Sequence, residues 1–264
     1  MPERPFISLL SDFGLRDPSA GIMRAVVLGI APRADIVDLS HDVAKYQVRD
    51  GALILWCAAP YLPVGAHVAV VDPGVGTERR PIGLRTRRGD VLVGPDNGLL
   101  VPAADRLGGI VAAHVLAAAA YRLPVVSRSF HGRDIFAPAA AHLANGVVLE
   151  AFGPALDQAE LVRLPWPEAS VSPGVLAAAV LYVDTFGNVK LGAESSHLVA
   201  ALGEIPWGTP LRVTIQPGRA STAPSFVATW SATFGHVSRG SPLLYEDSYG
   251  RLCLAVNQGD AAAR

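Results

Sequence analysis

The sequence has few cysteines, few charged residues and no long hydrophobic run. Cys57 and Cys253 are its only cysteines. Two are too few for a disulfide framework or a cysteine-rich zinc site, so we expect reduced core residues. The apolar run at 174–183 is shorter than the about 20 residues that cross a bilayer, and the first residues lack the extended apolar segment of a secretory signal. These absences favour a soluble, cytoplasmic protein with no membrane span.

Charge of either sign is also scarce. Asp, Glu, Lys and Arg make up 17% of the chain, and the formal net charge is −1. A chain without a basic surplus has no electrostatic attraction for nucleic acid or an anionic membrane. Half of the residues are hydrophobic, and 264 residues suffice for one large domain or two ordinary ones. We therefore expect a sizeable buried core and no nucleic-acid partner.

Residues 1–165 alternate between strand-like and helix-like segments. Strands are predicted at 6–10, 36–39 and 68–71. A first helix is predicted with Asp17 as its N-cap and Pro18 as its first residue, and it ends before Pro32. A second helix is predicted at 49–59. A hairpin at 82–93 and a helix at 135–143 follow. Alternation of this kind is typical of βαβ units. We predict an α/β domain with a mostly parallel central sheet.

The pattern changes after a segment rich in proline. Residues 166–174 include Pro167, Pro173 and Gly174, which predicts an interdomain linker. Beyond it, short strand-like runs are separated by turns, and no long helix is expected. We predict that residues 175–264 form a small all-β, barrel-like domain.

A carboxylate follows each of two predicted strands. Asp12 comes after the first strand, and Asp72 ends the strand at 68–71. Open α/β sheets bind ligands at the carboxyl ends of their strands. Gly74 and Gly76 allow close backbone approach to a ligand, and Arg79 adds a guanidinium. The alternative is a purely structural role, in which Asp72 caps its strand in a tight turn and Arg79 is a solvated surface residue.

One histidine precedes a predicted helix. His131 lies just before the segment 135–143, where a loop residue can face a cleft. A lone histidine is more often structural than catalytic, so from its position alone both interpretations stay open.

Seven segments, in this order and at these spacings, form a specific set. They are SDFGLRDPSAGIMRAV, IVDLSH, VVDPGVGTERRPI, VGPDNGLL, FHGRDIFAPAAAHLANG, YVDTFGNV and AVNQGDAA. Together they resemble the S-adenosyl-L-methionine (SAM) hydroxide adenosyltransferases, SAM hydrolases related to fluorinating and chlorinating enzymes. The resemblance covers nearly the whole chain. It implies an N-terminal α/β domain, a C-terminal β-barrel, and a homotrimer whose active sites each use one subunit's N-terminal domain and a neighbour's C-terminal domain.

The resemblance also implies a reaction and a set of roles. SAM and water would give adenosine and L-methionine, with SAM as the substrate and no cofactor or metal. Asp72, Arg79 and His131 match the residues that activate the water. The implied substrate contacts are Asp12 to the ribose hydroxyls, Asp17 and Ser19 to the methionine part, Tyr46 to the sugar, Asp184 and Asn188 to methionine, Phe186 to adenosine, and Ser248 and Asn257 near the amino acid or adenine. The sequence departs from the family in two places. Asn188 is followed by residues 189–192, where relatives usually carry a polar Thr-Asn pair, and Tyr46 stands where other members carry Phe or Trp.

The chemistry of SAM is compatible with these residues. The sulfonium departs as a neutral thioether, so the reaction needs no general acid but does need a nucleophile in line at the 5′ carbon. Arg79 would stabilise negative charge on the oxygen, neutral His131 would accept the proton, and Asp72 would orient either partner.

Three alternatives to SAM hydrolysis remain. A SAM-dependent halogenase would place a halide where Asp72 carries a carboxylate, and the two charges repel. A non-catalytic SAM or adenosine binding module has no use for the whole trio. Hydrolysis of another adenosyl substrate is the third alternative, and the sequence leaves it open.

Overall fold

The computed structural model describes residues 4–216 and 224–264. The chain forms two compact units, Met1–Leu164 and Pro165–Arg264. Within the predicted linker at 166–174, residues Ser170–Ser172 form strand β7, which pairs antiparallel with β8 (Val175–Ala177). Gly174, with φ +78°, lies in the turn of this hairpin. The predicted linker therefore extended too far into the second unit.

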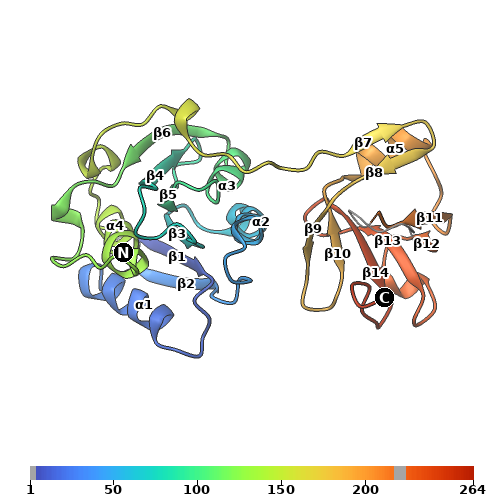
Figure 1. The fold of residues 1–264 in the computed structure, drawn as a ribbon, viewed down its shortest axis with the longest axis horizontal. Helices are drawn as coiled ribbons and strands as arrows, with labels where there is room; N and C mark the ends of the chain where they lie inside the picture. Colours follow the sequence, from blue (N-terminus) through green and yellow to red (C-terminus); the bar gives the residue numbers. More distant parts are fainter. Residues whose placement is uncertain (1–3, 217–223) are drawn as a thin grey trace. The chain divides into compact units, whose positions relative to one another are not determined.

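The first unit is built on a six-stranded sheet with the order β2-β1-β3-β5-β4-β6 (Figure 1). Its strands are β1 (Phe6–Ser11), β2 (Asp35–Ser40), β3 (Ala66–Val70), β4 (Pro81–Thr86), β5 (Val91–Pro95) and β6 (Ile110–Val115). The pairs β2-β1, β1-β3 and β3-β5 are parallel, whereas β4 is antiparallel to both neighbours. The sheet is therefore mixed, with β4 alone reversed, and the hairpin predicted at 82–93 is confirmed.

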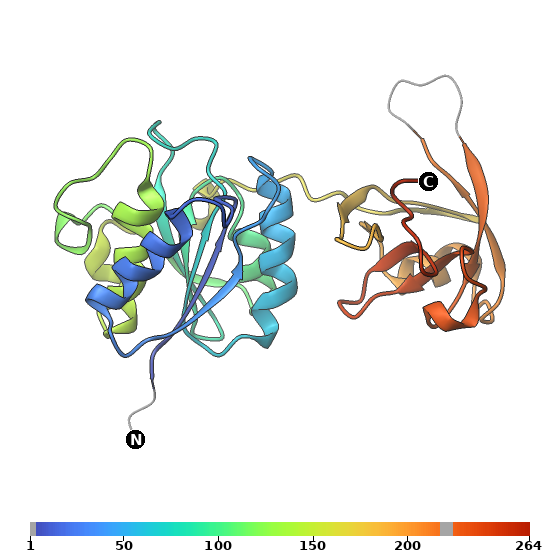
Figure 2. The same cartoon turned by 90° about the horizontal axis from the view of Figure 1, so that it is seen from below.

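Helices cover both faces of this sheet, as Figures 1 and 2 show. The helices are α1 (Ser19–Ile30), α2 (Val48–Ala58), α3 (Val101–Arg106) and α4 (Ala137–Ala144), with 3₁₀ turns at Ala59–Tyr61, Ala119–Tyr121, Leu149–Phe152 and Gln158–Glu160. Alternate side chains of a strand point to opposite faces. Accordingly, Leu9 packs in the core with α1 and α4, and Leu10 in the core with α2 and α3.

Two helix starts differ from the predictions. Helix α1 begins at Ser19 with Pro18 as its N-cap residue, so Asp17 lies one residue before the cap. The first two residues of the helix predicted at 135–143 belong to a π-helical turn, η3 (Gly132–Phe136), and α4 begins only at Ala137. A π-turn cannot be read from apolar periodicity, and such turns occur frequently at functional sites.

The second unit contains a six-stranded sheet with the order β11-β12-β13-β14-β10-β9. The strands are β9 (Val180–Val183), β10 (Val189–Leu191), β11 (Pro210–Thr214), β12 (Ser225–Trp230), β13 (Pro242–Glu246) and β14 (Leu252–Val256), with a 3₁₀ turn at Phe234–His236. All pairs are antiparallel except β12-β13. Among the described residues, β9 and β11 form the two edges and do not pair, so a closed barrel is not confirmed.

The all-β prediction for this unit is wrong in one element. Helix α5 (Ser195–Leu202) buries Leu198 against Trp230 and Leu252. Its start has a capping box, in which Glu194 and His197 each accept a hydrogen bond from the other's backbone N–H. Glutamate as the cap and histidine three residues later differ from the usual Ser or Thr with Glu, so this start was missed. In the parts of the chain described, no helix is both long and apolar enough to cross a membrane.

Candidate active site

Two carboxylates lie at the same edge of the first unit's sheet. Strands β1 and β3 pair in parallel with Ser11 opposite Val70. Asp12 follows Ser11 directly, and Asp72 comes two residues after Val70. The strand order reverses here, because the chain goes from β1 to β2 on one side and then to β3 on the other. Crevices at such reversals are where open α/β sheets bind ligands.

The turn after β3 brings Arg79 back onto Asp72. Val75 N–H donates to Asp72 O over 3.2 Å, and Thr77 N–H donates to Gly74 O over 3.2 Å. These successive turns allow Arg79 Nε to donate to both Asp72 oxygens, over 3.1 and 2.9 Å. The Arg79 and Asp72 side chains are only 9% and 5% exposed. The result is a buried, charge-assisted ion pair.

Arg79 also links this pair to His131. Its Nη2 donates to His131 Nδ1 over 2.8 Å. The two loops pack closely at Gly76, where a Cβ atom would lie 2.3 Å from the Arg128 carbonyl oxygen. The absence of a side chain at Gly76 therefore permits the contact between the loop that carries Arg79 and the loop that carries His131.

The contact determines the proton positions on His131. A guanidinium only donates hydrogen bonds, so Nδ1 must accept and the ring carries its proton on Nε2. Burial lowers the pKa of His131, and the charge of Arg79 lowers it further. His131 is therefore neutral near neutral pH, with its Nε2–H available as a donor.

A second nitrogen of Arg79 is unsatisfied. Arg79 Nη1 is buried and has no hydrogen-bond partner among residues 4–216 and 224–264. A buried donor without a partner costs free energy. Arg79 is therefore held in place by its other nitrogens, with Nη1 as a donor left over.

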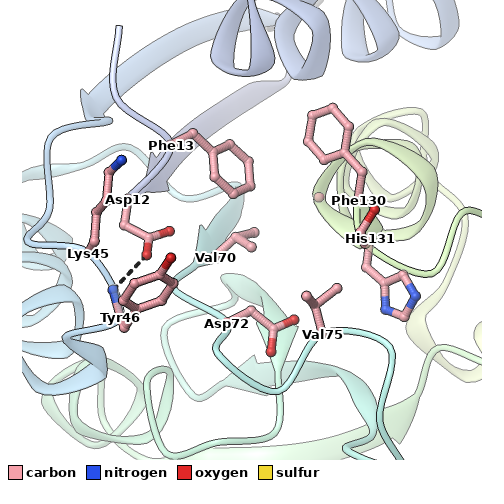
Figure 3. A pocket seen from close by; sticks show the side chains of 11 residues that line it. Asp12, Phe13, Lys45, Tyr46, Val70, Asp72, Val75, Phe130 and His131 are labelled. Atoms are coloured by element: carbon pink, nitrogen blue, oxygen red, sulfur yellow. Dashed lines mark hydrogen bonds between the residues drawn. The ribbon is translucent and has the colours of Figure 1, made fainter. Parts of the chain in front are cut away.

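A cavity of about 240 Å³ opens beside the trio (Figure 3). Its lining residues are Asp12, Phe13, Lys45, Tyr46, Val70, Asp72, Val75, Ser129, Phe130, His131 and Gly132. Figure 3 shows Asp12 and Tyr46 on the opposite side of the cavity from His131. The structure thus gathers Asp12, Tyr46, Asp72 and His131 around one space, and Arg79 bonds to the last two without lining the cavity itself.

Sequence reasoning missed seven of the lining residues, including Phe13, Phe130 and Lys45. Phe13 and Phe130 pack edge to face, with ring centroids 5.5 Å apart. Both lie inside segments that carry the family resemblance, next to Asp12 and His131, so their position was a usable signal. Lys45 adjoins Tyr46, and nothing in its sequence pattern marks it.

Asp12 and Tyr46 are joined through the backbone. Tyr46 N–H donates to Asp12 Oδ2 over 2.9 Å (Figure 3). Tyr46 has φ +66°, in the left-handed region that is uncommon for a bulky side chain. This unusual backbone places both the amide and the ring of Tyr46 at the cavity.

Two predicted contacts in the first unit do not line the cavity. Asp17 is exposed and accepts a hydrogen bond from Ser19 N–H over 3.3 Å. This local contact stabilises the turn just before α1. Neither Asp17 nor Ser19 is among the residues that line the cavity.

Three predicted residues of the second unit form one turn. Asp184 Oδ1 accepts from the N–H groups of Phe186 and Asn188, both over 2.9 Å, and Oδ2 accepts from Asn188 Nδ2 over 2.8 Å. These bonds shape the β9–β10 turn and leave Phe186 77% exposed. Ser248 is exposed between β13 and β14, and Asn257 Nδ2 donates to Val237 O over 2.8 Å.

Comparison with known families agrees with the two-unit architecture. Residues 7–153 match the SAM hydroxide adenosyltransferase N-terminal domain, and residues 178–264 match the C-terminal domain of the same family. The chain belongs to the SAM hydroxide adenosyltransferase family.

Individual relatives cover nearly the full chain. A protein from Salinispora tropica named (R)-S-adenosyl-L-methionine hydrolase is 44% identical, over 99% of this chain and 94% of its own. A fluorinase from Actinopolyspora mzabensis is 28% identical, over 98% and 93%. A solved structure of an uncharacterized conserved protein from Thermotoga maritima is 34% identical, with a TM-score of 0.88 over 97% of this chain and 94% of that chain.

Proposed function

We propose that this member of the family is an enzyme that hydrolyses SAM to adenosine and L-methionine. The observation that carries the proposal is the buried chain Asp72–Arg79–His131 beside the cavity. The hydrolase from Salinispora tropica, at 44% identity over almost the whole chain, supports the same activity.

In the proposed step, the water oxygen bonds to the 5′ carbon while the carbon–sulfur bond breaks. The electron pair of the carbon–sulfur bond stays on sulfur, which leaves as a neutral thioether. No residue therefore has to protonate the leaving group. His131, which lines the cavity, donates its Nε2–H to the oxygen, and the positive charge of Arg79, held against Asp72 and His131, favours the hydroxide form. The trio therefore acts mainly by stabilising negative charge on the nucleophile.

The hydrogen bond from Arg79 changes the role expected for His131. Its Nδ1 is already an acceptor for Arg79, and Nε2 carries the proton, so neither nitrogen is free to accept one. We assign proton acceptance to the carboxylate of Asp72, which lines the cavity and keeps acceptor capacity beyond its bonds to Arg79. His131 is then a donor and an orienting group rather than the general base.

The substrate contacts implied by the resemblance complete the proposal. Asp12 would hold the ribose hydroxyls, with the Tyr46 ring against the sugar, and both line the cavity. We also propose contacts to the methionine end from Asp17, Ser19, Asp184 and Asn188, because carboxylates complement the sulfonium and ammonium charges. Phe186, Ser248 and Asn257 stay proposed contacts to adenosine or the amino acid.

Halogenation is the closest alternative. The fluorinase relative is more distant than the hydrolase, at 28% against 44% identity. A halide beside Asp72 would meet a carboxylate, whereas water can give that group its proton. A binding module would have no use for the buried trio.

The homotrimer, the cytoplasmic location and the absence of a cofactor or metal are proposals that rest on the resemblance and composition.

The test is one incubation of the purified protein with SAM in chloride buffer made with heavy-oxygen water. We expect labelled adenosine and methionine by mass spectrometry. Chloro-adenosine would instead identify a halogenase, and intact bound SAM would overturn catalysis. Sedimentation of the active protein tests the homotrimer.

Variants of two adjacent arginines test the trio. Arg79→Lys should lose turnover while SAM still binds, because lysine cannot bridge Asp72 and His131 as the guanidinium does. Arg80→Lys is the matched control, since Arg80 pairs with Asp96 over 2.6 Å and lies outside the trio. Equal turnover in the two variants would contradict the assigned role of Arg79.

A further inference from the structure

A network of hydrogen-bonded polar side chains, buried at Ser11 and His41, begins at the residue before Asp12. Ser11 Oγ lies 2.7 Å from His41 Nδ1, and His41 Nε2 lies 3.3 Å from Asp38 Oδ1. The His41 side chain is 2% exposed. Asp38 and His41 belong to the segment IVDLSH, to which the proposed reaction gives no role.

The donors and acceptors in this chain are determined by its ends. Asp38 also accepts from Arg24 Nη1 over 2.8 Å, so it acts as a carboxylate and His41 Nε2 carries the proton. Ser11 Oγ accepts from Phe13 N–H over 3.3 Å and donates its own proton to His41 Nδ1. Each hydrogen bond from Arg24 to Phe13 thus has a defined donor and acceptor.

Backbone bonds join the same two segments. Gly14 N–H donates to His41 O over 2.6 Å, and Val43 N–H donates to Ser11 O over 3.4 Å. The segment that contains His41 and Val43 then continues to Tyr46, whose N–H donates to Asp12 Oδ2. Asp12 therefore lies between Ser11 and Phe13, which both take part in the hydrogen-bond network of His41. The Asp12 carboxylate also accepts from Tyr46, which lies in the same segment as His41.

We propose that His41 is a positioning residue that orients the Asp12 carboxylate for the two ribose hydroxyls. The inference rests on the proposed function only in taking a ribose as the ligand of Asp12. A carboxylate that binds a diol must present its oxygens in one orientation. If neighbouring hydrogen bonds already fix the carboxylate in that orientation, binding does not have to overcome the entropy cost of ordering it, and affinity is preserved.

The same sheet contains a matched control. Ser8 Oγ lies 2.9 Å from His67 Nδ1, and His67 Nε2 lies 3.0 Å from Asp90 Oδ1, with His67 and Asp90 fully buried. This chain also joins a β1 serine to a histidine and an aspartate. It begins three residues earlier in β1, and none of its members is next in sequence to a lining residue, whereas Ser11 directly precedes Asp12.

The experiment compares His41→Gln with His67→Gln in the full-length protein. Glutamine can still donate to the aspartate but no longer accepts from the serine. We expect His41→Gln to weaken adenosine binding about tenfold, to raise KM for SAM similarly, and to leave kcat within about twofold. Calorimetry should show unchanged L-methionine binding. His67→Gln should lower the unfolding temperature while adenosine affinity stays at the wild-type value.

Two further variants separate positioning from general damage. His41→Asn should restore much of the adenosine affinity, because its amide oxygen can accept from Ser11 near the place of Nδ1. In an Asp12→Ala background, His41→Gln should cause no additional loss, since its effect passes through Asp12.

Several results would overturn the proposal. These are wild-type adenosine affinity in His41→Gln, an equal loss of methionine affinity, or an additional loss when Asp12 is already absent. Wild-type protein that binds adenosine without hydrolysing SAM would overturn the proposed function and leave this binding test valid.

Discussion

Removal of the Asp72 carboxylate should destabilise the first unit as well as stop the reaction. In Asp72→Ala, the Arg79 guanidinium would lose its bonds to both carboxylate oxygens while it stays 9% exposed. Breaking one side of a buried ion pair costs about 3–5 kcal/mol. For a unit of this size, that corresponds to a fall of roughly 6–20 °C in unfolding temperature.

A second variant separates the buried charge from the lost contacts. Asp72→Ala combined with Arg79→Met removes both charges and fills part of the space with an apolar side chain. Because hydrophobic replacement of a whole buried pair is often neutral, the double variant should recover most of the stability. It should recover none of the hydrolysis, since both charged groups of the proposed step are gone.

Differential scanning calorimetry and SAM turnover measure these two effects independently. Asp72→Ala that unfolds at the wild-type temperature would show that the pair is not buried in solution. A double variant no more stable than the single variant would show that the unpaired guanidinium is not the cause of the loss.

Two further predictions concern His131 and Gly76. Since burial and Arg79 lower the pKa of His131, kcat/KM should be flat near neutral pH and fall only on the acid side, below the ordinary histidine value of about 6.5. An acid limb centred above that value in the pH–rate profile would contradict the assigned environment. Gly76→Ala should lower both stability and kcat, because the new Cβ would lie 2.3 Å from Arg128 O and separate the two site loops. Gly174→Ala is the control, with a similar φ of +78° and no atom within 4 Å of its Cβ; it should cost only about 1 kcal/mol in chemical denaturation, and an equal loss in both would refute the steric argument.

Local patterns predicted most of the first unit. Apolar runs marked β1 and β3, and the residues after them, Asp12 and Asp72, lie at the sheet edge where parallel strands place them. The errors occurred where the local signal is weak. They include the capping box of α5 and the π-turn after His131, neither of which follows from apolar spacing.

The sequence by itself determined the order of the elements and the chemistry available at the carboxyl edge of the sheet. These depend on side-chain periodicity and turn residues, which act over a few positions. Only the tertiary structure decided that Arg79 donates to His131, 52 residues further along the chain, and that His41 bonds to Ser11, 30 residues earlier. Such contacts depend on how loops pack after the sheet has formed. They determine which nitrogen of each histidine carries the proton, and so what each histidine can do.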